Sequence, residues 1–260
     1  MKQNTLHEVT PSSMGTMPTL VQCVSIPRSG HHYLMRMLNE YFNGDGSSSE
    51  RFAYCRYYHC CRSRPCRRYG ADSVASKPEI FLQKSHDLQL RDRDDDFEES
   101  SLEVTNGIKY LIQVRQPIAS VLSDFRLYKK TQSRRQARGE MTGSLQEWEC
   151  FAVEELEYRK RFLEKWILDN PWAESDEYLF LDYDNLIDNP TDTLTHAIRF
   201  VSRGQKVDKS RVSEVLARHP VKEKRDPRNS EFFATPNDPE PLMSNVWRAC
   251  QEKIAGLAGT

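Results

Sequence analysis

The amino-acid sequence predicts an α/β fold, a single domain with a central parallel sheet flanked by helices on both faces. Two observations predict it. Short apolar runs and longer segments of helical apolar spacing follow one another in the order strand, helix, strand, strand, helix, helix, strand, helix, which suggests a parallel sheet covered by helices. One run, 108–114, is largely apolar, as expected of a parallel strand that is buried on both faces. We expect the domain to cover residues 19–260, after a short disordered lead-in at 1–18.

Strands are expected at short runs rich in β-branched and aromatic residues, and helices at segments with a 3.6-residue apolar period. The expected strands are 19–26, 79–83, 108–114 and 178–181. The expected helices are 33–42, 117 to about 129, 144–170, 190–201 and 209–218. Two charged stretches interrupt this order: a Cys- and Arg-rich insertion at about 43–77, and an acidic loop at about 91–105 that we expect to be solvated.

The composition limits the classes of partner. The 260 residues carry a net charge of −1, with 38% hydrophobic residues and a mean hydropathy of −0.73. No overall field therefore attracts nucleic acid or an anionic membrane, and any anion site must be local. No apolar run is long enough to span a bilayer, and the first 19 residues lack the apolar core of a signal peptide. We expect a cytoplasmic protein.

The first predicted strand runs into Pro27-Arg28-Ser29-Gly30, and a helix follows at once. This order aligns backbone N–H groups at a helix N-terminus, which suits a phosphate or a sulfate. Gly30 permits a close approach of the backbone, and Arg28 adds a cation. An ordinary strand-to-helix turn is the alternative interpretation. The Lys-Ser/Thr pair of a Walker A loop is missing, so we expect an anion that is bound without a metal.

Four stretches resemble the motifs of sulfotransferases that use 3′-phosphoadenosine 5′-phosphosulfate (PAPS). The segment 24–34 is similar to the family's 5′-phosphosulfate loop, and Lys84-Ser85-His86 to the Lys-Thr/Ser-His of its cytosolic branch. The segment 110–117, followed by Ser123, is similar to the 3′-phosphate motif. The segment 183–201 resembles the family's Tyr-Glu-Asp-Leu, Asp-Pro and Phe-Leu-Gly run. The stretches keep the family's order and cover about a quarter of the chain.

The resemblance implies transfer of a sulfuryl group from PAPS to a hydroxyl acceptor, by in-line attack and without a metal. His86 would be the general base, because a histidine is ordinarily neutral near pH 7. Arg28 and Lys84 would stabilise charge on the sulfuryl oxygens and the leaving phosphate. The other implied contacts fall into three groups: the 5′ end on Arg28, Ser29, Gly30, His31 and His32, the 3′-phosphate on Arg115 and Ser123, and adenine on Tyr33 and Tyr183. Ser123 lies about two helical turns after Arg115, so it needs a bend at Gln116 to approach the same group.

The chain departs from the family at two of these places. His31 and His32 stand where the family has hydroxyl residues. Their backbone N–H groups remain available, and either a protonated imidazole replaces the hydroxyl contacts or one of the two rings competes with His86 as the base. The family's C-terminal Arg-Lys-Gly loop has no clear counterpart. We take Arg225 to cover the 3′-phosphate. It belongs to a basic group whose alternative interpretation is a solvated surface: Lys222, Lys224, Arg225 and Arg228.

Four of the seven cysteines are bunched in the insertion: Cys55, Cys60, Cys61 and Cys66. Free thiols are the default, with a disulfide or a zinc site as alternatives, although the adjacent Cys60-Cys61 pair fits zinc poorly. We predict no metal site. The arginines of 51–68, with those of 134–138, either face an anionic acceptor such as an acidic glycan or form a solvated surface.

Two other functions remain open from the sequence. One is a metal-dependent nucleotide kinase, which should carry the missing Lys-Ser/Thr pair. The other is a non-catalytic nucleic-acid binder that uses 51–68, where Tyr54, Tyr57 and Tyr58 are interleaved with arginines. We favour the sulfotransferase, with PAPS and a hydroxyl acceptor as partners, the acceptor being a glycan or a small metabolite, and with no nucleic acid.

Overall fold

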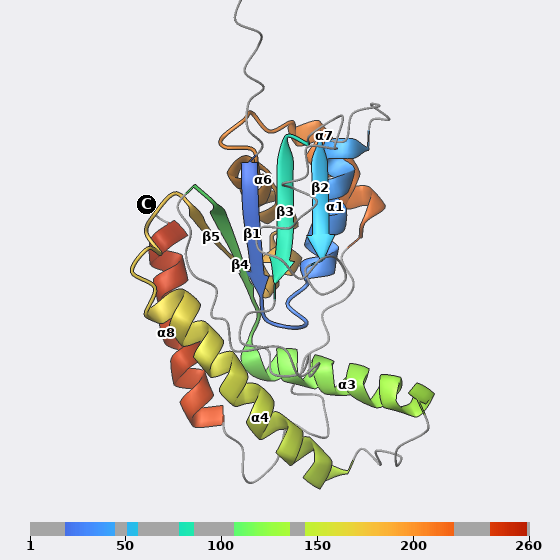
Figure 1. Ribbon diagram of the computed structural model, residues 1–260, viewed down its shortest axis with the longest axis vertical. Coiled ribbons are helices and arrows are strands. Elements are labelled where there is room, and N and C mark those ends of the chain that lie inside the picture. Colours follow the sequence, from blue (N-terminus) through green and yellow to red (C-terminus); the bar gives the residue numbers. More distant parts are fainter. Residues whose placement is uncertain are drawn as a thin grey trace, which may run out of the picture.

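The computed structural model describes residues 19–44, 51–56, 78–85, 107–135, 144–220 and 240–258. Its centre is a five-stranded sheet in the order β2-β3-β1-β4-β5 (Figure 1). The strands are β1 (Thr19–Ser25), β2 (Phe52–Arg56), β3 (Ile80–Ser85), β4 (Lys109–Val114) and β5 (Tyr178–Asp182). All neighbouring strands are parallel, so their carboxyl ends meet at one edge of the sheet. The predicted α/β fold is confirmed.

Helices cover both faces of the sheet. The elements are α1 (His31–Asn43), α3 (Pro117–Arg135), α4 (Leu145–Leu163), a π-helical segment η2 (Glu164–Leu168), α5 (Tyr183–Asp188), α6 (Pro190–Val201), α7 (Lys209–Arg218) and α8 (Glu240–Ala258). One buried cluster joins α1, α6 and α7 to one face, and another joins α3, α4, η2 and α8 to the other face. In Figure 1, α3 runs beneath the arrowheads of β1, β2 and β3, across the carboxyl edge of the sheet.

The helices form where the sequence supplies an apolar stripe and a cap. In α1, Leu34, Met37 and Leu38 follow helical spacing and are fully buried. At the start of α4, Ser144 and Glu147 form a reciprocal capping box, which satisfies two N–H groups that the helix itself leaves without a partner. Pro190 starts α6, where its missing N–H is not needed.

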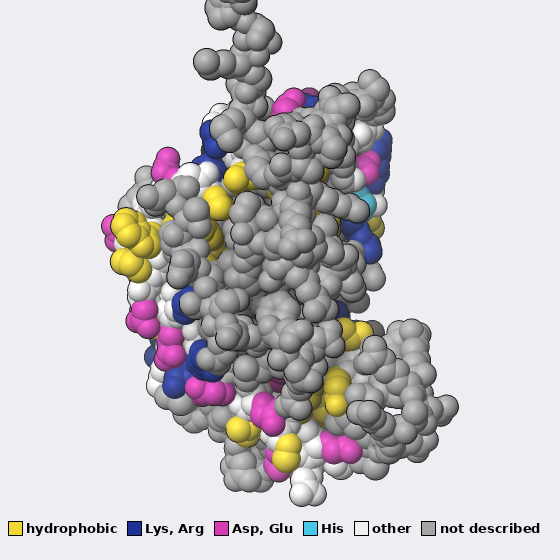
Figure 2. Space-filling view, viewed as in Figure 1, with side chains coloured by type: hydrophobic (Ala, Val, Ile, Leu, Met, Phe, Trp, Pro, Cys, Tyr) yellow, Lys and Arg dark blue, Asp and Glu magenta, His cyan; other side chains and the backbone are white. Residues whose placement is uncertain are grey.

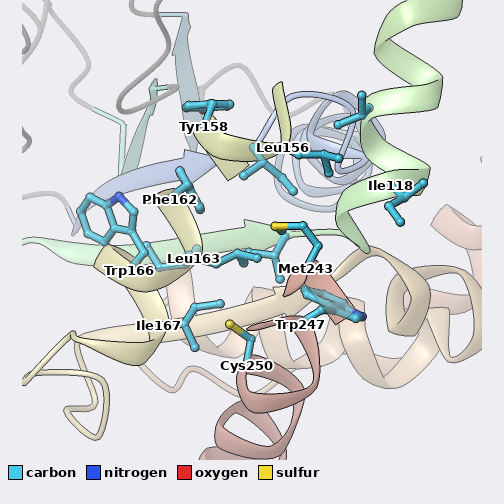
Figure 3. Packing of buried hydrophobic residues seen from close by; sticks show 14 of the residues in the cluster. Ile118, Leu156, Tyr158, Phe162, Leu163, Trp166, Ile167, Met243, Trp247 and Cys250 are labelled. Atoms are coloured by element: carbon cyan, nitrogen blue, oxygen red, sulfur yellow. The ribbon is translucent and has the colours of Figure 1, made fainter. Parts of the chain in front are cut away.

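Three elements lie where no helix or strand was predicted from the sequence: β2, α5 and α8. Strand β2 falls inside the predicted insertion. It is an edge strand that pairs only with β3, so it does not need the continuous apolar run of a central strand. Helix α8 follows the last helix that we predicted. Its Met243, Trp247 and Cys250 are buried against Leu163 and Ile167 on the α4 side of the core (Figure 3). The predicted long helix 144–170 is present as α4 and η2.

The described surface carries mixed charge. Figure 2 shows acidic and basic side chains interspersed along the lower left of the molecule, over α4 and α8, with no broad area of one sign. This fits the net charge of −1. None of the helices in the described ranges combines the length and the apolar character that a membrane crossing requires.

Candidate active site

The direction of the chain changes between β1 and β4. From β1 the chain continues to β2 at one side of the sheet, and from β4 to β5 at the other side. Connections that leave in opposite directions open a crevice at the carboxyl ends of the two strands, which is where open α/β sheets bind ligands. The loop 26–30 follows β1 at this point, and Arg115 follows β4.

Every carbonyl group of the loop 26–30 accepts a hydrogen bond from within the chain. Helix α1 supplies the partners of the last one, since the N–H groups of Tyr33 and Leu34 donate to the Gly30 oxygen. Side chains supply the others: Ser29 Oγ to Ile26 at 2.8 Å, Ser120 Oγ to Pro27 at 3.0 Å, Arg115 Nη1 to Arg28 at 3.1 Å, and Gln113 Nε2 to Ser29 at 2.7 Å. The oxygens of the loop are thus turned toward the protein and held there.

The amide groups of the same loop behave differently. Within the described part of the chain, no hydrogen-bond partner meets the N–H groups of Arg28, Ser29 and Gly30. Unsatisfied backbone donors are rare in folded proteins. Arg28 and Gly30 have positive φ angles of 65° and 80°, on either side of Ser29, and such an alternation forms a concave nest of N–H groups. The nest adjoins the positive end of the α1 dipole. Together these features describe an anion site.

Gly30 has a second reason to be glycine besides its φ angle. A Cβ atom at this position would lie 2.5 Å from Cδ2 and 2.7 Å from Cε2 of Tyr183. The Tyr183 ring therefore rests directly on the Gly30 backbone. On this ring lies Arg115, whose Cζ is 4.3 Å from the ring centroid. Tyr183 and Arg115, which follow neighbouring strands, are thus stacked against the loop.

Arg115 is half-buried, and its buried Nε atom has no hydrogen-bond partner among the described residues. Burial lowers the pKa of its guanidinium, and Arg28 lowers it further, whereas Tyr183 and Asp184 raise it. An arginine remains charged at neutral pH despite such a shift. A charged, half-buried group with a spare donor calls for an anion as its partner.

Ser123 lies close to the same place. Its Oγ accepts a hydrogen bond from Arg28 Nε at 3.1 Å, and Arg28 is in turn bonded through its carbonyl to Arg115. The structure therefore brings together three of the predicted residues. The bend before α3 is held by the Gln116 side chain, whose Oε1 accepts the Ala119 N–H at 2.6 Å.

His31 and His32 point to different surroundings. The His31 ring is buried, with Nδ1 3.2 Å from Cys23 Sγ and Nε2 3.2 Å from the Tyr54 hydroxyl. His32 is exposed, and its ring lies edge-on to His31 at 5.8 Å. Burial raises the pKa of the Cys23 thiol to about 12, against a smaller opposite effect of Lys84. The His31 side chain thus contacts residues of β1 and β2.

Two further predicted residues can be placed. Lys84, near the end of β3, is 2% exposed and lies beside Cys23 on the α1 face of the sheet. The Tyr33 hydroxyl donates to the His219 carbonyl at 2.8 Å. Burial raises the pKa of Tyr33, and nearby Tyr183 adds to the shift. The two tyrosines are neighbours at the loop.

Other predicted residues lie outside the described ranges. These are His86, which follows the last residue of β3, and the basic group with Arg225. Cys60, Cys61 and Cys66 lie outside them too, whereas Cys55 is buried on β2. Among the described residues, no group of three or more His, Cys, Asp or Glu side chains is arranged as a metal site.

Two residues that hold the loop, Gln113 and Ser120, were not predicted from the sequence. Gln113 offered a signal, since it is a polar residue near the end of the largely apolar β4. It is fully buried, and its Oε1 has no hydrogen-bond partner. Ser120 offered no signal that distinguishes it from any other serine in the first turn of a helix.

Neither a family model nor a curated protein matches this chain. Among solved structures, the chain is similar to the sulfotransferase domain from the Synechococcus PCC 7002 olefin synthase, with 17% identity and a TM-score of 0.39 over 93% of this chain and 94% of that one. A second is the sulfotransferase domain from the curacin biosynthetic pathway, with 13% identity and a TM-score of 0.36 over 93% and 96%. Both are sulfotransferase domains. The likeness is distant.

Proposed function

We propose that this chain transfers a sulfuryl group from PAPS to a hydroxyl acceptor. The observation that carries the proposal is the one-sided hydrogen bonding of the loop 26–30. Its carbonyl groups are all bonded inward, while the N–H groups of Arg28, Ser29 and Gly30 have no partner in the described chain. Such a nest at a helix N-terminus suits the phosphosulfate end of the nucleotide.

A nucleotide with phosphate groups at both ends fits the charges beside the loop. Arg28 and Arg115 are held near one another, with Arg115 Nη1 bonded to the Arg28 carbonyl. Two neighbouring cations repel, and an anion between them removes the repulsion. Ser123 adds a hydroxyl at the same place. We assign the 5′ end of PAPS to the nest and the 3′-phosphate to Arg115 and Ser123, with Tyr33 and Tyr183 next to adenine.

The proposed chemistry is an in-line displacement at sulfur. The acceptor oxygen forms a bond to sulfur, the bond from sulfur to the phosphate oxygen breaks, and the acceptor proton passes to His86. The products are a sulfate ester and 3′-phosphoadenosine 5′-phosphate (PAP). Arg28 and Lys84 stabilise charge on the leaving phosphate, and the loop amides contribute as fixed donors.

The residues of the loop favour this reaction over a nucleotide kinase. A Walker A loop places Lys and Ser or Thr directly after its last glycine, where they meet the terminal phosphates and Mg²⁺. This chain has His31 and His32 there. The His31 ring is bonded to Cys23 and Tyr54 instead of facing the nest.

Thermal unfolding with a panel of ligands tests the proposal. A ligand that binds only the folded chain raises Tm, by an amount set by its concentration relative to its Kd. We expect PAP to raise Tm in the presence of EDTA, and ATP with Mg²⁺ or a mixed-sequence oligonucleotide to leave it unchanged. Stabilisation by ATP only with Mg²⁺ would favour the kinase, and stabilisation by the oligonucleotide alone the nucleic-acid binder. Either result overturns the proposal.

The His86→Ala variant tests the assignment of the base. Loss of a general base lowers kcat by about 10²–10⁴-fold, and we expect the Kd of PAP to stay within about twofold, because His86 is assigned to the acceptor. His196→Ala is the matched control, since His196 lines a hollow at the opposite edge of the sheet. Sulfate transfer that survives in His86→Ala would show that another group takes the proton.

A further inference from the structure

Arg159 on α4 is the second-largest side chain that is fully buried in the described chain. It lies outside the motifs that resemble the family. Its Nη1 forms a salt bridge with Glu155, one turn earlier on the same helix, and its Nη2 lies 3.3 Å from Asp124 on α3. The charge is thus compensated by two carboxylates. Its Nε atom makes a different contact, a hydrogen bond of 2.8 Å to Ser120 Oγ.

That hydrogen bond continues to the nucleotide loop. Ser120 Oγ donates to the Pro27 carbonyl at 3.0 Å. Because an arginine only donates and a carbonyl only accepts, the Ser120 hydroxyl proton must point at Pro27. Two consecutive hydrogen bonds, here called the donor chain, thus run in a fixed direction from Arg159 through Ser120 to Pro27, the residue before Arg28. Arg28 has a positive φ angle of 65°, a strained conformation for a non-glycine residue that the surroundings must hold in place.

One face of α3 makes all of these contacts. Ser120, Ser123 and Asp124 are spaced i, i+3 and i+4, so they lie on the same side of the helix. Ser120 holds the Pro27 carbonyl, Ser123 holds the Arg28 side chain, and Asp124 pairs with Arg159. The backbone and the side chain of the loop are therefore fixed by a helix whose own position is tied to α4.

We propose that Arg159 is a positioning residue for the nucleotide loop, which acts through Ser120 to fix the direction of the Arg28, Ser29 and Gly30 amides. The inference rests on the proposed function only for the identity of the bound nucleotide. A buried ion pair generally adds little to stability, and apolar residues of similar volume often replace it without loss. A purely structural role for Arg159 therefore predicts that an apolar replacement is tolerated with nucleotide affinity unchanged.

Two variants test the proposal. Ser120→Ala breaks the donor chain and leaves the ion pair in place. The double variant Glu155→Leu/Arg159→Met removes the salt bridge with Glu155 together with the Nε donor, and leaves half-buried Asp124 as the carboxylate that loses its arginine. Lys160→Met is the matched control, because Lys160 is the next residue on α4 and forms only a partly exposed pair with Glu164 at 3.9 Å.

Two readouts are needed, both recorded well below the Tm of every variant. The first is the set of backbone amide NMR signals of Ser29 and Gly30 without nucleotide, and the second is the Kd of PAP from calorimetry. We expect both test variants to shift the signals beyond the control and to raise Kd at least tenfold. Signals that match the control in both variants, or a Kd within twofold of the wild-type value, would overturn the proposal.

The amide signals also separate this inference from the proposed function. If they move as expected while the wild-type chain binds no PAP, the positioning role stands and the nucleotide assignment is wrong. If PAP binds the wild-type chain and the signals do not move, the nucleotide assignment stands and the positioning role is wrong. Failure of the double variant to fold would leave Ser120→Ala to decide.

Discussion

Basic side chains gather at both edges of the sheet, yet the two places are built differently. At the carboxyl edge, Arg28 and Arg115 lie beside the N-terminus of α1. At the amino edge, a hollow of about 740 Å³ lies beside the C-terminus of α6. Its basic lining residues are Lys109, Arg199 and Arg203, and His196, Asp176 and Glu177 also line it. By charge alone, both edges are candidates for an anion site.

The backbone φ angles do not distinguish the two edges either. Arg203 and Gly204 at the amino edge have positive φ angles of 54° and 83°, much like Arg28 and Gly30. The difference lies in the amides. At the amino edge, the N–H groups of Arg203 and Gly204 donate to carbonyls at the end of α6, at 3.3 and 2.7 Å. They cap the negative end of a helix dipole.

At the carboxyl edge the same kind of backbone precedes a helix. The N–H groups of Arg28, Ser29 and Gly30 are left without partners in the described chain, next to the positive end of the α1 dipole. Arginine and left-handed backbone therefore do not identify an anion site by themselves. Backbone N–H groups without internal partners do identify one, and three variants test this difference between the two edges of the sheet.

The Arg115→Ala variant should have the largest effect. It removes a charged donor set that we assign to the 3′-phosphate, and charge-assisted hydrogen bonds contribute about 1.5–3 kcal/mol each. We expect the Kd of PAP to rise by roughly 100-fold, which corresponds to about 2.7 kcal/mol. Titration calorimetry measures it.

Arg115→Lys is the matched control. It keeps the charge but not the planar fork, so its Kd should lie between those of the wild type and Arg115→Ala. If the Arg115→Ala chain bound PAP as well as the wild type, Arg115 would not hold the 3′-phosphate. The carboxyl edge would then no longer be the assigned nucleotide site.

The Gly30→Ala variant should have an intermediate effect. Its methyl group would meet the Tyr183 ring at 2.5 Å, at a φ angle of 80°. The left-handed conformation costs a non-glycine residue about 1–2 kcal/mol, and displacement of the ring adds to it. We expect the free energy of unfolding in urea to fall by about 2–4 kcal/mol and the Kd of PAP to rise roughly tenfold.

The Gly204→Ala variant distinguishes the effect of backbone strain from the effect of the contact with Tyr183. Gly204 has a φ angle of 83°, but a Cβ there would meet nothing within 4 Å. The variant should lose about 1–2 kcal/mol of stability and keep its affinity for PAP. Equal losses of affinity in Gly30→Ala and Gly204→Ala would mean that the Tyr183 contact has no part in binding.

The features that were predictable from the sequence are those set by neighbours along the chain. A largely apolar strand followed by Arg and Pro gave β4 and the start of α3. The order strand, glycine and helix gave the loop, because each of its parts depends on local backbone preference. The resemblance to the family implied that Arg115 and Ser123 bind one group, which stays a prediction, and in the structure Arg28 contacts both.

The features that were not predictable depend on packing between distant segments. Strand β2 exists because β3 offers it an edge, and nothing in 52–56 alone requires a strand. The donor chain from Arg159 to Pro27 crosses 132 positions of sequence and needs α4 to lie on α3. The ring of His31 has Cys23 and Tyr54 as neighbours, a position that the sequence did not predict, since helix direction and sheet packing decide where a side chain points.

The Lys109→Ala variant should have the smallest effect, and it decides whether the amino edge is inert toward the nucleotide. Lys109 Nζ donates to the Asp176 carbonyl at 3.0 Å and lies 4.5 Å from the centroid of the Phe200 ring. Burial lowers its pKa, and Arg203 acts in the same direction, whereas Asp176 and Glu177 oppose them. One donor of Lys109 and its charge thus already have partners within the chain.

We therefore expect Lys109→Ala to leave the Kd of PAP within twofold of the wild-type value. The free energy of unfolding should fall by about 1 kcal/mol, from the lost hydrogen bond and the lost contact with the Phe200 ring. Calorimetry and urea unfolding measure the two quantities on the same sample. A loss of PAP affinity as large as that of Arg115→Ala would place the nucleotide at the amino edge, because no contact of Lys109 reaches the loop 26–30. Backbone N–H groups without hydrogen-bond partners would then not indicate where the nucleotide binds.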